Sequence, residues 1–250
     1  MWPVTGDYDL NDLVVSYRYK FVSNAQNSVV EFYADYAPLA AGATYYNGFG
    51  IQFPFSPNDV KSVTGQSAKN AFIKLNSNGT EAGQSKAVII PFDDHSNLIS
   101  NPGNASILNT DMAKAKMKGD TSRIYLQFTT PISQSSLGTA PFNPFAISNK
   151  RRSYEVHLPG QLPTDLADKG LLGTLQDASN ASTSTYYITK DNHPWALSFT
   201  VPFTYPIEGV DISKAYLRFL DWAKSGGTQY TDWYTNTSSA YRNTANLYTK

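Results

Sequence analysis

The sequence predicts a mainly β protein, an antiparallel β-sandwich or jelly roll with long loops and one α-helix in its C-terminal half. Several segments alternate apolar and polar residues with a period of two, which is typical of half-buried strands. Aromatic residues make up 14%, including 17 Tyr, and charged residues only 16%, a composition that favours strands and turns over helices. The strands are unevenly spaced with long connections, which favours a sandwich or jelly roll over a simple barrel.

Alternation is clearest at residues 15–21 and 30–36, and the polar linker 23–28 between them predicts a hairpin. Five more strands are expected at residues 48–53, 86–92, 123–129, 153–158 and 195–203. The second of these five contains a continuous apolar run, as buried central strands do. The last would place Trp195 in the core.

One helix is predicted over residues 212–223, where apolar side chains recur at helical spacing. Asp211 stands at the N-cap position, and Gly226 and Gly227 follow the last turn. The stretch 97–111 is rich in Asn, Ser and Gly and is interpreted as a long surface loop. Residues 1–250 are therefore expected to form a single domain, which is long enough to bury a sizeable core.

Charge and composition exclude several classes of protein. Twenty basic residues balance twenty acidic ones, so no basic surface for nucleic acid is expected. No apolar run approaches the roughly 18–20 residues of a membrane helix, so this domain should not insert into a membrane. Cysteine is absent and the three histidines are scattered, which argues against disulfides and zinc sites. No signal peptide precedes the first strand, and Met1 is interpreted as a start placed inside a longer exported chain.

The strongest chemical signal is an acidic loop before the first strand. Asp7, Asp9 and Asn11 match the D-x-[DN]-x-[DN] opening of calcium-binding loops. Asp12 follows where an EF-hand requires Gly, and a strand begins directly afterwards, so this is no EF-hand. The pattern predicts a Ca²⁺ site that holds the ion with these four residues and recruits further oxygens from elsewhere in the chain.

Asp93 and Asp94, just past the apolar strand 86–92, are the candidates for the distant carboxylate. The alternative is a solvated turn in which Asp and Asn side chains cap backbone groups. Calcium is preferred because three carboxylates within six residues repel one another unless solvent or a cation screens them.

The segment Gly6–Arg18, with the acidic loop and the strand after it, resembles the opening of the LruC-type domain of large bacterial surface proteins and lipoproteins. Further matching motifs cover nearly the whole chain, at residues 47–53, 144–145, 151–152, 155–159, 163–165, 190–192, 194–197, 205–206, 222–223, 225–227 and 232–234. The resemblance implies a domain at the cell surface, within a larger exported protein. It supplies no catalytic residues.

Two groups of side chains are candidates for ligand binding. Arg151, Glu155 and His157 share one face of strand 153–158, opposite its apolar residues. They could bind an anionic or hydroxylated ligand, but a cross-strand salt-bridge row is the preferred interpretation.

The second group follows the predicted helix and is aromatic: Tyr230, Trp233 and Tyr234. Such side chains could stack on sugar rings. Large aromatic residues usually bury most of their area, so pinning of the C-terminal tail is preferred.

No catalytic constellation is evident, and the G-x-S-x-G motif of α/β-hydrolases is absent. The leading hypothesis is a non-enzymatic, calcium-stabilised binding or adhesion module that recognises a glycan or a surface protein. The second is a structural spacer in a surface assembly. The third is a glycan hydrolase, which would need a pair of carboxylates in a cleft that the sequence does not reveal.

Overall fold

The computed structural model describes residues 2–99 and 107–250 and confirms the predicted mainly β, sandwich-like class. Eight strands are formed in these residues: β1 Val14–Ser23, β2 Val29–Ala40, β3 Gly48–Gln52, β4 Val60–Thr64, β5 Val88–Phe92, β6 Ser122–Ile132, β7 Asn143–Ile147 and β8 Glu155–His157. The α-helices are short: α1 Gln134–Leu137, α2 Ile212–Ala215 and α3 Phe219–Lys224.

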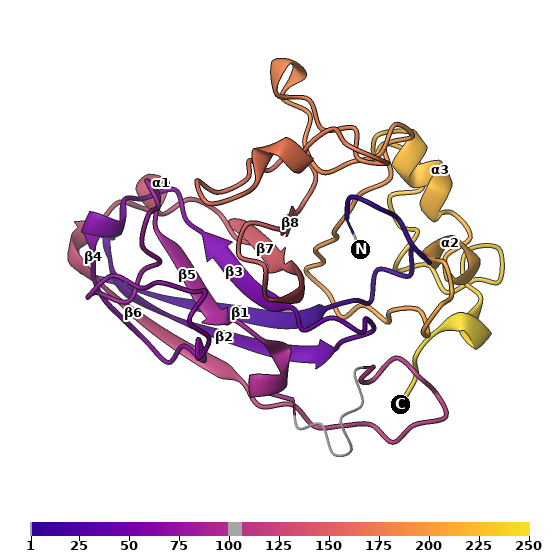
Figure 1. The fold of residues 1–250 in the computed structure, drawn as a ribbon, viewed down its shortest axis with the longest axis horizontal. Coiled ribbons are helices and arrows are strands. Elements are labelled where there is room, and N and C mark those ends of the chain that lie inside the picture. The colour runs from indigo at the N-terminus through magenta and orange to yellow at the C-terminus, as the bar shows by residue number, and fades with distance from the viewer. Residues whose placement is uncertain (1, 100–106) are drawn as a thin grey trace.

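The strands form two antiparallel four-stranded sheets, with the orders β1-β2-β6-β4 and β5-β3-β7-β8 (Figure 1). The predicted hairpin joins β1 to β2, and the Asn24 N–H donates to Ser28 O across its turn. The first sheet has three long strands, whereas β8 spans only three residues. The second sheet therefore covers the first incompletely at one side.

Apolar faces of the two sheets meet in the main core. Phe32 and Leu126 of the first sheet and Ile51 and Ile89 of the second are all buried there. The other face of the second sheet is buried as well, since Val88 and its neighbours pack beneath the loop around residue 73. Burial on both faces explains the continuous apolar run of β5, as predicted, but β5 lies at the edge of its sheet and not at the centre, where this pattern placed it.

A second core lies at the C-terminal end, where α2, α3 and the tail pack around Trp233. Figure 1 places the indigo N-terminal segment between this yellow end and the sandwich. Tyr8 of that segment belongs to the same core, and its backbone O accepts from Ile212 N. The acidic loop is therefore held between the two halves of the fold.

The predicted strand at 195–203 is wrong. Trp195 is buried as expected, but the segment makes no ladder, and Pro194 forms only an isolated bridge with Ile188. Pro194 and Pro202 lack the N–H that a ladder needs, so alternation here marks an extended segment that packs one face without pairing.

The predicted helix is broken in two. Asp211 caps α2 by accepting from Ser213 N, and Gly226 and Gly227 end α3 with positive φ, both as predicted. Between them Tyr216 is extended and bridges Arg242, while Leu217 N donates to Tyr241 O. Pairing with the C-terminal tail replaces the helical hydrogen bonds at this point.

Three differences concern short or uncertain segments. The structure also contains β4 and β7, which were not among the expected strands. The expected strand 153–158 contracts to β8. Of the expected surface loop 97–111, residues 100–106 lie outside the described residues.

Candidate metal centre

The acidic loop is wound tightly before β1. Gly6, Tyr8 and Leu10 all have positive φ, of 58°, 53° and 54°. Such backbone is rare outside glycine, and the loop holds it because Tyr8 is anchored in the C-terminal core, where its hydroxyl donates to Pro194 O at 2.8 Å. The positive-φ residues alternate with Asp7 and Asp9, and the carboxylates of these two residues line one small site.

Three carboxylates meet at this site: Asp7, Asp9 and Glu208 each offer an oxygen, and these oxygens lie within 4.8 Å of one another. Asp9 is almost fully buried, and its two oxygens accept from Asn11 N at 3.3 Å and from Gly209 N at 3.0 Å. Glu208 accepts from the Thr110 hydroxyl at 2.6 Å. Asp7 is exposed, so the site opens to solvent on one side.

Asn11 adds a fourth oxygen and is completely buried. Its amide nitrogen donates to Pro206 O at 3.1 Å, which turns Oδ1 the other way, and this buried Oδ1 has no hydrogen-bond partner. A Cβ placed on Gly42 would lie 1.8 Å from Asn11 Oδ1 and 2.8 Å from Glu208 Oε2. Both acceptor oxygens therefore border the same small space.

The site concentrates negative charge. Burial, followed by the charge of Asp7, raises the pKa of Asp9 to about 7. Burial and the same neighbour raise the pKa of Asp12, and burial outweighs the Thr110 hydrogen bond to raise that of Glu208. Among the described residues, none of these carboxylates forms an ion pair with Lys, Arg or His. Clustered oxygens without a counter-charge suit a hard cation, and Ca²⁺ takes six to eight such ligands.

Asp12, Asp93 and Asp94, which were also predicted as ligands, are not part of this oxygen cluster. The two oxygens of Asp93 accept from Asn70 N at 2.5 Å and Asn97 Nδ2 at 2.7 Å. Asp94 accepts from Ser96 N and pairs with Lys150 at 2.8 Å. The distant carboxylate is Glu208 instead. No sequence signal identified it, because it lies in an irregular segment almost the whole chain away from the loop.

The second candidate group lies inside the protein. Glu155 and His157 are fully buried, so the polar face of β8 points inward, the reverse of the prediction. Strand period alone does not say which face is covered, and here residues 81–84 and 164 bury the polar side.

The charge partner is Arg152 and not Arg151. Arg152 pairs with both Glu81 and Glu155, and His157 Nε2 lies 2.8 Å from Glu155. Burial opposes ionisation of Glu155, but the hydrogen bond and charge of His157, with Arg152, lower its pKa to about 2. Arg151 is exposed and stacks on Tyr154, with the guanidinium 3.7 Å from the ring centroid. The row is a buried salt-bridge network, in keeping with the preferred interpretation.

The aromatic side chains after α3, Tyr230, Trp233 and Tyr234, pack against other residues of the fold. Trp233 is buried and touches Tyr216 and Phe219, with ring centroids 5.1 and 5.0 Å apart. Tyr234 stacks beside Phe199, and Tyr230 lies under the Arg218 guanidinium. These contacts favour the interpretation that the aromatic residues pin the C-terminal part onto the fold.

Residues 27–234 match the family described as a domain of unknown function, DUF4842. The chain belongs to the DUF4842 family. The match includes Glu208 but begins after the acidic loop, so the loop lies outside the part that defines the family.

This DUF4842 chain is also similar in fold to a solved structure, named as that of a "putative lipoprotein" from Bacteroides ovatus. The TM-score is 0.67 at 17% identity, and the similarity covers 97% of this chain and 73% of the other. No curated protein matches the DUF4842 chain. Within residues 2–99 and 107–250, no helix has the length and hydropathy to cross a bilayer.

Proposed function

We propose that this DUF4842 chain is a calcium-binding, non-catalytic module of an exported bacterial surface protein, of the LruC type, that binds a glycan or a protein partner in adhesion. The observation that carries the calcium part is the buried, unpartnered Oδ1 of Asn11 beside three carboxylates. A buried acceptor without a donor is costly, and a bound cation removes that cost.

The cation would tie the N-terminal loop to the segment that carries Glu208. Asp7, Asp9 and Asn11 belong to the loop, and Glu208 comes from the chain just before α2. Because the loop lies between the sandwich and the C-terminal core, calcium would stabilise the contact of both halves and pre-order the surface around it. The LruC resemblance of the loop and the fold likeness to a lipoprotein support the surface location.

A structural spacer is the second candidate. Glu155, His157 and Trp233, which were candidates for ligand contact, are buried and serve the packing of the fold. This favours a spacer over recognition by those residues, and leaves any recognition surface to other parts of the molecule.

Thermal unfolding of the metal-stripped protein, with and without millimolar calcium, tests the proposal. A ligand that binds only the folded state at 100 times its Kd stabilises by about 2.7 kcal/mol, so the wild type should show a clear rise in Tm. Asp9→Asn should lose the rise, and Asp35→Asn, at a half-buried carboxylate on the first sheet that pairs with Arg18, should keep it. No rise in the wild type would refute calcium binding. Glycan arrays probed in calcium then separate a binding module, which gives saturable binding, from a spacer.

A further inference from the structure

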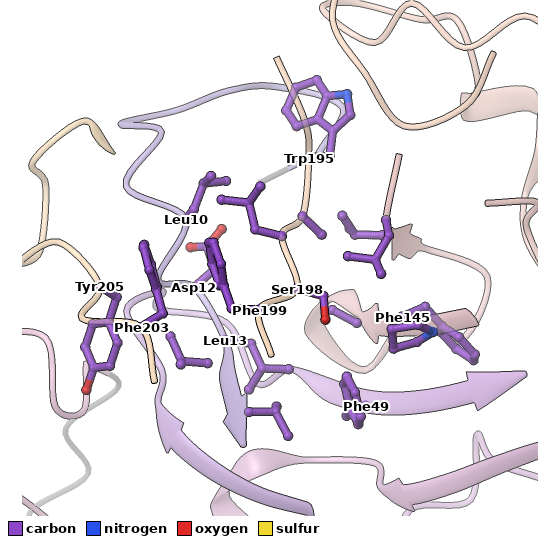
Figure 2. A pocket seen from close by; sticks show the side chains of 18 of the residues that line it. Leu10, Asp12, Leu13, Phe49, Phe145, Trp195, Ser198, Phe199, Phe203 and Tyr205 are labelled. Carbon is purple, nitrogen blue, oxygen red and sulfur yellow. The ribbon is translucent and has the colours of Figure 1, made fainter. Parts of the chain in front are cut away.

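A cavity of about 540 Å³ opens beside the metal centre, between the N-terminal loop, β1 and residues 195–205. Figure 2 shows its walls, which are mostly apolar and aromatic and include Leu13, Phe49, Phe145, Trp195, Phe199 and Phe203. A concave, largely apolar cavity of this size is typical of sites for small organic molecules.

The cavity follows from the uneven sheets. β8 is short, so the inward-facing Tyr17 and Tyr19 of β1 are only half-buried. The segment 195–203 lies over these two tyrosines, where a further strand could lie, but it does not pair with β1. It approaches at one point, where Tyr17 OH and Ser198 Oγ lie 3.0 Å apart. The space left between β1 and this segment is the cavity.

One polar group stands out within it. The carboxylate of Asp12 lies among Leu10, Phe199 and Phe203 in Figure 2. It has no hydrogen bond and no ion pair in the described parts of the chain; burial and Asp7 disfavour its charged form, whereas the positive charge of the N-terminal amino group favours it. The residue is held in place because its backbone O accepts from Asn47 Nδ2 at 3.1 Å.

Charge then decides which ligand the cavity can hold. Asp7 and Asp9 line the same cavity as Asp12, and both belong to the carboxylate cluster with Glu208, so the polar end of the cavity is acidic. A carboxylate or phosphate ligand would therefore be repelled. A polyol would leave many of its hydroxyls unpaired against apolar walls, which is costly.

We propose that this cavity binds a small amphipathic organic cation, with its apolar body among the aromatic walls and its amine or guanidinium paired with Asp12. The proposal goes beyond the calcium function and does not require it. Calcium at the neighbouring carboxylates would leave Asp12 free to pair with the ligand.

The test is calorimetric titration of the full chain with three probes of equal length: octylamine, 1-octanol and octanoate. A charge-assisted hydrogen bond in a half-buried site predicts that octylamine binds about ten- to a hundredfold more tightly than octanoate. Asp12→Asn should remove that preference, whereas Asp191→Asn, an exposed carboxylate that does not line the cavity, should keep it. Ser198→Trp, at the exposed rim, should block all three probes without disturbing the core.

Octanoate binding as tightly as octylamine, no saturable octylamine binding, or an unchanged preference in Asp12→Asn would each overturn the proposal. Calcium binding is measured on the same samples. Loss of octylamine selectivity with calcium binding intact would refute the cavity ligand alone. Selectivity without calcium binding would refute the metal centre alone.

Discussion

Asn11 Oδ1 and Glu208 Oε2 border one small space next to Gly42, although the two residues lie at opposite ends of the chain. Neither oxygen has a basic partner in the described chain, and Oδ1 of Asn11 has no donor at all. This relationship links the acidic loop to the segment before α2 and is the basis of the proposed metal centre.

The space beside Gly42 tests that relationship directly. In Gly42→Ala, the new methyl group would overlap Asn11 Oδ1, at 1.8 Å, and force the amide away from the site. Overpacking of this kind costs about 1–3 kcal/mol, measurable by urea unfolding of the metal-free protein, and the calcium response should fall as well. Gly170→Ala is the control, since its methyl group meets only the side chain of Asp168, at 3.1 Å. Equal effects of the two changes would contradict the account.

In the metal-free protein, the stability contributed by the Asp9 carboxyl should fall as pH rises from about 4 to about 7. The pKa of Asp9 is raised from 3.8 to about 7 by burial and by Asp7, so the folded state binds this proton more tightly than the unfolded chain does. Stability from the protonated carboxyl is therefore lost as pH rises through that range, on the order of a few kcal/mol.

Urea unfolding across pH checks this expectation. Asp9→Asn should flatten the profile and be more stable than the wild type at pH 8 when calcium is absent, whereas saturating calcium should favour the wild type. A metal-free wild type whose stability rises between pH 4 and pH 7 in parallel with Asp9→Asn would show that Asp9 ionises without cost.

The buried salt-bridge network predicts very different roles for two adjacent arginines. Arg152→Ala leaves Glu81 and Glu155 buried without their cation, which should cost about 3–5 kcal/mol. Arg151→Ala removes the exposed contact with Tyr154 and a long hydrogen bond to Ser148 Oγ, at 3.3 Å, and should change the free energy of unfolding by less than about 1 kcal/mol. Chemical denaturation of both variants decides the matter, and similar losses would contradict the described network.

Trp233 should matter for stability rather than for sugar stacking. It is buried among the aromatic residues of the C-terminal core, so Trp233→Ala should cost about 3–5 kcal/mol in unfolding experiments. A variant of unchanged stability that loses binding on a glycan array would instead support the stacking hypothesis.

The fold class and the β1–β2 hairpin could be predicted because alternation and turn residues are local properties of sequence. The acidic loop was visible for the same reason. Glu208 was not, since the contact is made by folding: Gly209 N donates to Asp9 across 200 residues of sequence. No local pattern distinguishes Glu208 from any other carboxylate in a loop.

Two other errors have physical causes. Alternation assigns two faces to β8 but does not say which is buried, and the partners that bury Glu155 come from distant loops. Alternation also suggested a strand at 195–203. Proline removes a backbone donor there, and the segment lines the cavity without pairing with a strand.

The central claim is that calcium is held by the loop together with Glu208. Calorimetric titration of the metal-stripped protein with calcium, comparing Glu208→Gln with Asp94→Asn, tests it most directly. The account predicts saturable binding in the wild type and in Asp94→Asn, whose carboxylate pairs with Lys150, and greatly weakened binding in Glu208→Gln. Unchanged affinity in Glu208→Gln, or no calcium binding by the wild type, would contradict it.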